Sequence, residues 1–427
     1  MHSMFRWPAL LLASVLVVSA CRDDSVPVAA PESPAFSRNE SEAASGVFHR
    51  YVAIGTSVSM GWASDGAIAA SQSQSWPLQL ARRADRAMTA PLIGSTGCRP
   101  PLLAPLASFR RISGDLITVP VPTLGCAPLL PGVTLPVANT AINAARAFDA
   151  RYTTPENVTD LSNKALYARV LPPGTTQVGA MERQNPKFVS VELGANEVLG
   201  ASDGRVIPGV TVVPARDFAP DYDAILERVR RKAKTGAVLV GLIDDARAFP
   251  AFRAGPELWA NRNEFLSVFN VAIQPDCENS PNYIVVPFRV PAAVAAGVTR
   301  QQNNLPPEPL SCAGGPPNVV DYVLDPGEIG QLNAIIDGID RHIWRQALVH
   351  RLAYFRLESL YGRPDLKAPF SVVQLMTTAT PYGPYMSLDG FHPSALGQTV
   401  LADAAARAIN VRYRLGIPSG LLAALAP

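Results

Sequence analysis

Short apolar runs alternate with amphipathic stretches along the chain after its first four dozen residues. The runs predict β-strands at residues 50–54, 187–193, 237–243 and 283–287, with a fifth at 371–375. They are apolar at nearly every position, as is typical of parallel strands that helices cover on both faces. The pattern therefore predicts an α/β fold, a three-layer α/β/α sandwich around a mainly parallel sheet.

The amphipathic stretches predict helices at residues 76–87 and 221–233, a long helix from 326 toward 360, and a final helix after Pro393. The long helix has a clear start. Asp325 stands at its N-cap, Pro326 in its first turn and Glu328 at the capping-box position.

The 427 residues include 40 prolines, many of which gather in two stretches, residues 97–136 and 289–317. Connections of this length are uncommon inside a compact domain. We interpret both as ordered excursions over the core that help to shape a substrate site, although decoration without function is an equal alternative. The length suits one large domain or two smaller ones, and we assign residues 47–417 to one domain with these loop insertions.

Charged residues make up 17% of the chain, hydrophobic residues 48%, and the formal net charge is +2. Such a chain can bury a large apolar core, so a wholly disordered protein is excluded. Nucleic-acid binders usually carry a strong positive charge, so nucleic acid is not expected as a partner.

The N-terminus carries an export signal. A basic start, an apolar run at residues 9–18 and two small residues precede Cys21, and the run is too short to span a membrane. This resembles a bacterial lipoprotein box, in which the cysteine receives the lipid anchor; an ordinary signal peptide is the alternative. We expect a signal peptide at residues 1–20, then Cys21 and a flexible tether to residue 46. The protein would be anchored to a membrane of the bacterial envelope, in the periplasm or at the cell surface.

The four other cysteines fall into two sequence-local pairs. Because an exported chain reaches an oxidising compartment, we predict the disulfides Cys98–Cys126 and Cys277–Cys312, although four cysteines allow three connectivities. The sequence contains no Cys-x-x-Cys or His-Glu-x-x-His spacing, so a zinc site is not expected.

The first predicted strand ends in a tight Gly-Thr-Ser turn. A serine at the carboxyl end of a parallel strand lies where ligands bind in open α/β sheets, so Ser57 is a candidate nucleophile. Serine there can also serve only as a helix cap. Ser59 occupies a position that is glycine in the Gly-x-Ser-x-Gly elbow, so that motif is not matched.

A hydroxyl nucleophile needs a base, and residues 387–394 supply His392 with Asp389 three positions before it. A neutral imidazole can accept the serine proton, and a carboxylate on its other nitrogen fixes the tautomer. The alternative is that both residues only cap the final helix.

A third segment ends the strand at 187–193 in a Gly-Ala-Asn turn. Asn196 is there a candidate oxyanion donor, because a side-chain N–H can point at developing negative charge. A turn asparagine without a catalytic role is the alternative. Three sheet-edge loops thus offer the residue types that one acyl-transfer site requires.

Together these segments resemble the sequence blocks of the SGNH hydrolases, the GDSL esterase/lipase family. Residues 55–59 (Gly-Thr-Ser-Val-Ser) are similar to its first block, residues 194–197 to its Gly-x-Asn-Asp block, and residues 389–394 to its last block. Residues 139–145 are similar to the remaining block and put Ala144 where the family has an oxyanion glycine. The order of the blocks along the chain is also the same.

Three positions depart from the family pattern. Thr56 and Glu197 replace aspartates, and Ala144 replaces the glycine. Only Ala144 touches the implied machinery, and its backbone N–H still serves if alanine adopts the required φ.

The resemblance implies a flavodoxin-like sheet and a serine esterase or lipase that needs no metal or organic cofactor. Ser57, Asp389 and His392 would be catalytic, and Ser57, Ala144 and Asn196 would hold the oxyanion. The implied substrate is a carboxylic ester with a lipid-like part. A carbohydrate O-acetyl ester is an alternative substrate, and a catalytically silent envelope-binding lipoprotein is an alternative function.

Overall fold

The computed structural model describes residues 38–316 and 319–420, so the predicted signal peptide and Cys21 lie outside the described residues. A four-stranded parallel sheet forms the centre of the fold, with the strand order β1-β2-β3-β9. Its strands are β1 (Tyr51–Gly55), β2 (Phe188–Glu192), β3 (Gly236–Gly241) and β9 (Ala353–Arg356). Nearly every residue of the first three strands is buried, which agrees with their continuous apolar pattern.

An additional segment pairs with the free edge of β1. Asn139 forms a parallel bridge with Ala53, and the Thr140 N–H donates to the carbonyl oxygen of Ala53 at 2.9 Å. Counted along the chain, this segment is the second strand, so the spatial order becomes 2-1-3-4-5. That order is the flavodoxin-like one, and the predicted fold class is confirmed.

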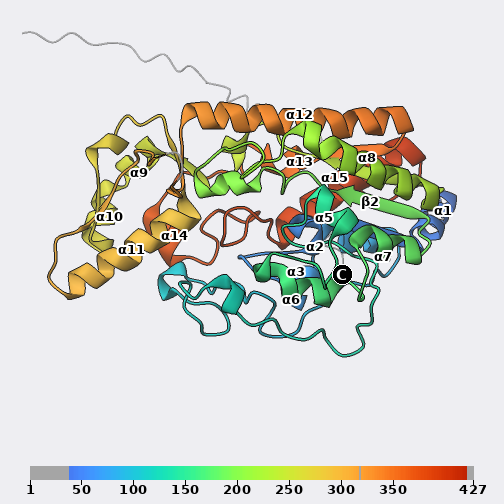
Figure 1. Ribbon diagram of the computed structural model, residues 1–427, viewed down its shortest axis with the longest axis horizontal. Coiled ribbons are helices and arrows are strands. Elements are labelled where there is room, and N and C mark those ends of the chain that lie inside the picture. The colour runs from blue at the N-terminus through green and yellow to red at the C-terminus, as the bar shows by residue number, and fades with distance from the viewer. Residues whose placement is uncertain (1–37, 317–318, 421–427) are drawn as a thin grey trace, which may run out of the picture. The chain divides into compact units, whose positions relative to one another are not determined.

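Helices cover both faces of the sheet (Figure 1). One layer holds α5 (Ala147–Tyr152), α7 (Gln177–Arg183), α8 (Ala215–Lys232) and α12 (Pro326–His350). The opposite layer holds α1 (Arg38–Phe48), α4 (Trp76–Arg83), α13 (Glu358–Tyr361) and α15 (Ala395–Tyr413). Further helices lie in the connections: α2 (Ser57–Met60), α3 (Ala69–Gln72), α6 (Leu161–Val170) and α14 (Val372–Thr377).

A large insertion follows β3 and builds two small sheets. The strands β4 (Phe252–Ala254), β6 (Tyr283–Val285) and β8 (Val323–Leu324) are antiparallel, while β5 (Val271–Ile273) pairs in parallel with β7 (Glu308–Leu310). The helices α9 (Gly255–Ala260), α10 (Arg262–Phe269) and α11 (Val286–Gln302) accompany them. The strand predicted at 283–287 therefore exists in part, but it lies outside the central sheet.

Three local predictions were wrong. Residues 371–375 belong to helix α14, because the Ser371 side chain accepts from the Gln374 N–H and starts a helix. The stretch 289–317 is largely regular, since α11 tolerates Pro291 in its interior. The helix predicted toward residue 360 ends at His350, where Arg351 adopts φ 53° without the usual glycine, and β9 follows.

Helix α1 occupies part of the expected tether, so the prediction of a flexible segment up to residue 46 was wrong for residues 38–46. The helix is held by its apolar end. The Phe48 ring stacks on that of Phe188 at 5.2 Å between centroids and lies 4.9 Å from the ring of Tyr51. The contact with Phe188 joins positions far apart in the sequence, which local composition cannot reveal.

The stretch 97–136 contains only short 3-10 turns, at Leu106–Ser108 and Val121–Thr123, and isolated bridges. Both predicted disulfides, Cys98–Cys126 and Cys277–Cys312, are present. Among the residues that the structure describes, no helix is long and apolar enough to cross a membrane.

We expect Phe48→Ala to lower the free energy of unfolding by about 3 kcal/mol, because it removes a fully buried ring. Urea denaturation measures this change. The matched control is Phe148→Ala on α5, where the ring is 57% exposed and the change should stay within about 0.5 kcal/mol. Equal effects of the two substitutions would contradict a docked α1.

Candidate active site

Ser57 lies at the carboxyl end of β1 and is the first residue of helix α2. Thr56 caps that helix, since its side chain accepts from the Val58 N–H. The turn is also fixed from β2. The Glu192 carboxylate accepts hydrogen bonds from the backbone N–H groups of Thr56 and Ser59, at 3.0 and 3.2 Å, and from the Thr56 hydroxyl at 2.8 Å. Burial raises the pKa of Glu192, and these hydrogen bonds oppose that rise.

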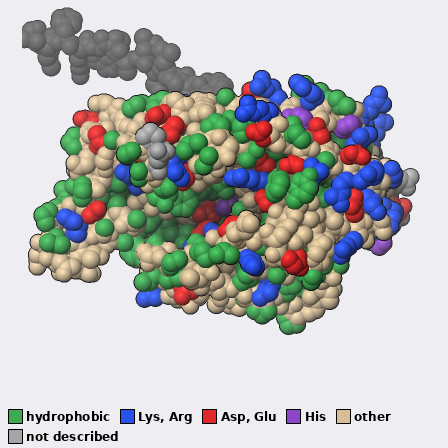
Figure 2. All heavy atoms as spheres, viewed as in Figure 1, with side chains coloured by type: hydrophobic (Ala, Val, Ile, Leu, Met, Phe, Trp, Pro, Cys, Tyr) green, Lys and Arg blue, Asp and Glu red, His purple; other side chains and the backbone are tan. Residues whose placement is uncertain are grey.

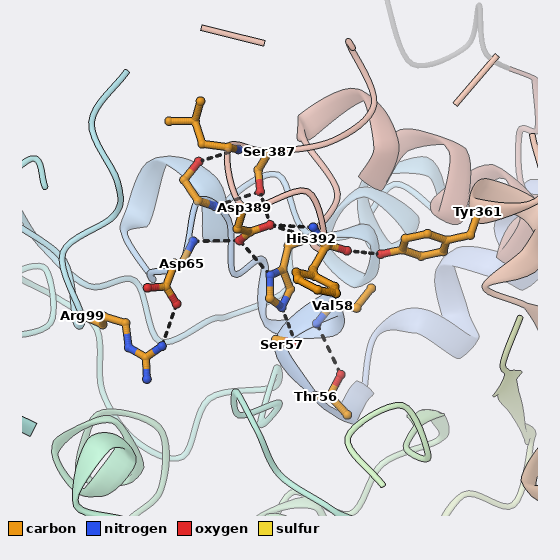
Figure 3. A network of polar contacts seen from close by, with 12 residues as sticks. Thr56, Ser57, Val58, Asp65, Arg99, Tyr361, Ser387, Asp389 and His392 are labelled. Atoms are coloured by element: carbon orange, nitrogen blue, oxygen red, sulfur yellow. Dashed lines mark hydrogen bonds and ion pairs between the residues drawn. The ribbon is translucent and has the colours of Figure 1, made fainter. Parts of the chain in front are cut away.

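The structure brings Ser57 and His392 together from opposite ends of the chain (Figure 3). The Nε2 atom of His392 lies 2.9 Å from Ser57 Oγ, and its Nδ1 atom lies 2.9 Å from Asp389 Oδ2. The loop that carries both His392 and Asp389 is tight, because the Ser387 N–H donates to the His392 carbonyl at 2.9 Å and Gly390 adopts φ 69°. The serine hydroxyl, the imidazole and the carboxylate thus form one continuous chain of hydrogen bonds.

Asp389 is buried, with 5% of its surface exposed, yet it stays ionised. Oδ1 accepts from the Ser387 hydroxyl at 3.1 Å and from the N–H groups of Phe391 and His392 at 3.0 and 2.9 Å. Burial alone would raise its pKa, but the nearby His392 ring and the hydrogen-bond donors lower the pKa of Asp389 to about 2. The carboxylate can therefore stabilise an imidazolium at neutral pH.

The three expected oxyanion donors surround this site. Ala144 adopts φ 62°, the left-handed conformation that its glycine counterpart would adopt freely. Neither its N–H nor that of Ser57 donates a hydrogen bond to another described residue. Asn196 uses one amide proton on the Ala145 carbonyl oxygen at 2.9 Å, which leaves its second proton available.

An apolar cavity of about 70 Å³ adjoins the serine and is called here the apolar cavity. Ser57, Asn196 and His392 are among the residues that line it. Its remaining wall is hydrophobic and includes Leu199, Leu242, Phe249, Phe252, Leu332, Ile336, Tyr361 and Phe391.

An open groove of about 860 Å³ also borders His392 and includes Ala144. Figure 2 shows a hollow in this face with hydrophobic side chains gathered around it. Both proline-rich stretches line the groove: Leu102, Leu106, Phe109, Leu116 and Ile117 come from the first, and Pro291, Ala292, Ala295 and Val298 come from the second.

A smaller chamber of about 290 Å³ shares Asn143, Ala144, Asp160 and Asn163 with the groove and is called here the polar chamber. Its wall includes Tyr167, whose hydroxyl makes no hydrogen bond to another described residue. Burial and the nearby carboxylates of Asp149 and Asp160 raise the pKa of Tyr167, so this hydroxyl remains a donor. Two partly exposed aromatic rings, Phe148 and Tyr152, also border the chamber.

Glu192 is the residue of this site that the sequence reasoning missed. A signal was present, because Glu192 is the only charged residue of the β2 run Phe188–Glu192. Within residues 38–316 and 319–420, no group of three or more His, Cys, Asp or Glu side chains is arranged to hold a metal ion.

No protein-family model and no curated protein matches the chain. Solved structures do match. A putative GDSL-like lipase from Parabacteroides merdae is 11% identical, with a TM-score of 0.34 over 86% of this chain and 95% of that one. An acetyl-xylooligosaccharide esterase from Geobacillus is 12% identical, with a TM-score of 0.34 over 86% and 94%. An extracellular lipase from Streptomyces rimosus is 12% identical, with a TM-score of 0.33 over 85% and 98%. At such scores the fold and the site rest on this chain's own strands and side chains.

Glu197 follows Asn196 and is fully buried. Its Oε1 atom accepts from the Ala147 N–H at 2.7 Å, while Oε2 has no hydrogen-bond partner among the described residues. Burial raises the pKa of Glu197 to about 7, because one donor does not replace the lost water.

Glu197→Gln should therefore stabilise the protein more at pH 8 than at pH 5. The unfolded chain releases this proton near pH 4.5 and the folded chain near pH 7, so the free energy of unfolding falls as the pH rises between those values. Glu197→Gln has no titrating group at this position, so its free energy of unfolding does not fall in this way. Its stability relative to the wild type should therefore grow by about 3 kcal/mol between pH 5 and pH 8. Urea denaturation at both pH values measures it, with the exposed Glu227→Gln as control. A pH-independent difference would contradict the assignment.

Proposed function

We propose that the chain is a serine hydrolase of the SGNH type that cleaves carboxylic esters. The observation that carries the proposal is the continuous hydrogen-bonded chain from Ser57 Oγ through the His392 ring to the Asp389 carboxylate, with 2.9 Å at each link. This chain ends beside backbone N–H groups without protein partners and beside the apolar cavity. A nucleophile, a base, oxyanion donors and a substrate pocket at one place are the parts that acyl transfer needs.

In the proposed mechanism, Ser57 Oγ attacks the ester carbonyl carbon and its proton passes to His392 Nε2. The carbonyl oxygen becomes an oxyanion. When the carbon–oxygen bond of the ester breaks, His392 returns the proton to the leaving alcohol, and the acyl group stays on Ser57. Water, activated by the same imidazole, then attacks the acyl-enzyme and releases the acid. Asp389 holds the ring and stabilises the imidazolium in both steps.

The oxyanion would be held by the N–H groups of Ser57 and Ala144 and by the free amide proton of Asn196. The left-handed backbone at Ala144 supports this assignment, because it keeps the geometry of a glycine position despite the methyl group. Donors fixed before the reaction stabilise the transition state without reorganisation.

The substrate best supported is an ester with a lipid-like acyl part. The apolar cavity begins at Ser57 and has an almost continuous hydrophobic wall, which suits an acyl chain. Because His392 must protonate the leaving alcohol, the alcohol would lie in the open groove that this ring borders. The apolar groove side chains extend the surface available to a lipid-like substrate.

A carbohydrate O-acetyl ester is the second candidate, and the polar chamber favours it. Amide, carboxylate and hydroxyl groups together with partly exposed aromatic rings are the surfaces that bind a sugar, through hydrogen bonds and apolar contacts with its ring. The acetyl group would then occupy only the mouth of the apolar cavity.

The expected attachment through Cys21 belongs to the same proposal. The two disulfides support an exported protein, because such bonds persist in oxidising compartments. A lipid anchor would hold the groove near a membrane, where lipid-like esters are concentrated.

Ser57→Ala should lower the hydrolysis of 4-nitrophenyl butyrate by about 10³-fold or more while the far-ultraviolet circular dichroism stays unchanged. A fluorophosphonate probe should label Ser57 in the wild type and not in this variant. Mass spectrometry of the labelled peptide identifies the residue. An unlabelled and inactive wild type would favour the silent envelope-binding protein, whereas turnover retained by the folded variant would overturn the assignment of Ser57 as the nucleophile.

A chain-length series of 4-nitrophenyl esters separates the two substrate candidates. We expect the wild type to prefer longer acyl groups to acetate, because the wall of the apolar cavity is almost continuously hydrophobic. Ile336→Phe should fill the apolar cavity and lower kcat/KM for decanoate about tenfold, with acetate turnover within twofold. Ile336→Leu, which keeps the volume, is the matched control. A strong wild-type preference for acetate would instead support the carbohydrate deacetylase.

A further inference from the structure

The turn Ala63–Gly66 follows the nucleophile segment and has an unusual backbone. Ala63 and Gly66 exchange two backbone hydrogen bonds, at 3.0 and 3.1 Å, so Ser64 and Asp65 are its two central residues. Their φ angles are 53° and 57°. Two-residue turns often need positive φ at both central positions, which serine occupies only with strain. Such a turn persists where its surroundings hold it.

The turn is held by the loop that carries the catalytic carboxylate (Figure 3). The Asp65 N–H donates to Asp389 Oδ2 at 2.8 Å, the oxygen that also faces the His392 ring. The Ser64 N–H donates to Ser387 Oγ at 2.9 Å, and Ser387 Oγ donates to Asp389 Oδ1 at 3.1 Å. The turn therefore reaches both oxygens of Asp389, one directly and one through Ser387.

The side chain of Asp65 points the other way and lies between two arginines. Its Oδ1 atom is 2.6 Å from Arg99 Nη1, and its Oδ2 atom is 2.7 Å from Arg111 Nη2. Arg111 is only 3% exposed and also donates to the Pro100 carbonyl at 2.8 Å. Asp65, Arg99 and Arg111 are called here the arginine clamp. Both arginines belong to the excursion 97–136, and Arg99 is next to the disulfide-bonded Cys98.

The clamp contacts the site in a second way. The Arg99 guanidinium lies 5.3 Å from the ring centroid of Trp62, and that ring lies 6.5 Å from the His392 ring. The excursion thus reaches the His392 ring through the packing of Arg99 and Trp62 as well as through the turn.

We propose that Asp65 is a positioning residue: the arginine clamp fixes its backbone N–H, which in turn fixes the Asp389 carboxylate against the His392 ring. The excursion 97–136 then governs how well Ser57 is activated, in addition to lining the groove. This inference rests on the proposed function, in which Ser57 is the nucleophile. Errors of about 1 Å in the placement of such groups cost up to about 100-fold in rate.

Arg99→Met tests the clamp with little risk to folding, because Arg111 still holds Asp65. We expect kcat for 4-nitrophenyl butyrate to fall about tenfold with KM within twofold, and fluorophosphonate labelling of Ser57 to slow about tenfold. Arg99→Lys should restore part of both rates. Asp65→Asn, which suits the left-handed backbone equally well, should have at least the effect of Arg99→Met.

Arg169→Met is the matched control. Arg169 donates to the carbonyl oxygens of Ala127 and Cys126, at 2.8 and 3.2 Å, so it anchors the same excursion without touching the clamp. Its labelling rate should stay within twofold of the wild type. An equal slowing in Arg169→Met would show that general loosening of the excursion is the cause, and the proposal would fail.

The proton on His392 Nδ1 gives a readout that does not depend on turnover. A proton shared with a carboxylate resonates at low field in the NMR spectrum, and we expect this signal to shift or broaden in Arg99→Met and Asp65→Asn but not in Arg169→Met. If both clamp variants showed the wild-type NMR signal and the wild-type labelling rate, the proposal would be overturned. If the wild-type protein showed the signal but did not react with the probe, only the proposed function would be contradicted.

Discussion

A carboxylate buried in a protein stays ionised only where hydrogen-bond donors replace its lost water, and the candidate site depends on that condition at Asp389. Its donors come from two segments, the loop 387–392 and the turn Ala63–Gly66. If Asp389 were neutral, it would no longer stabilise a charged imidazole. The folding of those two segments against each other is therefore a requirement of the chemistry as well as of stability.

Three buried acids near this end of the sheet show how the groups around a carboxylate shift its pKa. Asp389 accepts five hydrogen bonds, one of them from the His392 ring, and has a pKa of about 2. Glu192 accepts from Thr56 and Ser59 and fixes the nucleophile turn, but its burial still raises its pKa. Glu197, whose Oε1 atom accepts from the Ala147 backbone N–H, has a pKa of about 7. Thr56 stands where the family that the sequence resembles has an aspartate. Glu192 supplies a carboxylate to this turn from the neighbouring strand.

The sequence predicts those parts of the fold that leave local signals. Strands β1, β2 and β3 are continuous apolar runs, and the capping box at Asp325 starts α12 where expected. Ser57 and Asn196 follow the carboxyl ends of predicted strands, and His392 precedes the final helix. Their motifs and spacing were therefore enough to predict that they share one site. Strand β9 was missed because Arg351 ends the preceding helix without glycine. The arginine clamp gives no local signal, since a non-glycine turn and ion pairs across 34 and 46 residues create it.

The two partners of the serine–histidine contact lie 335 residues apart, near opposite ends of the folded chain. Closing so long a segment costs conformational entropy. A ribosome must add the 335 residues that lead from Ser57 to His392 before the imidazole can reach the hydroxyl. In the proposed mechanism, any fragment truncated before residue 392 would lack its base, so hydrolysis would stay latent until that residue has been synthesised.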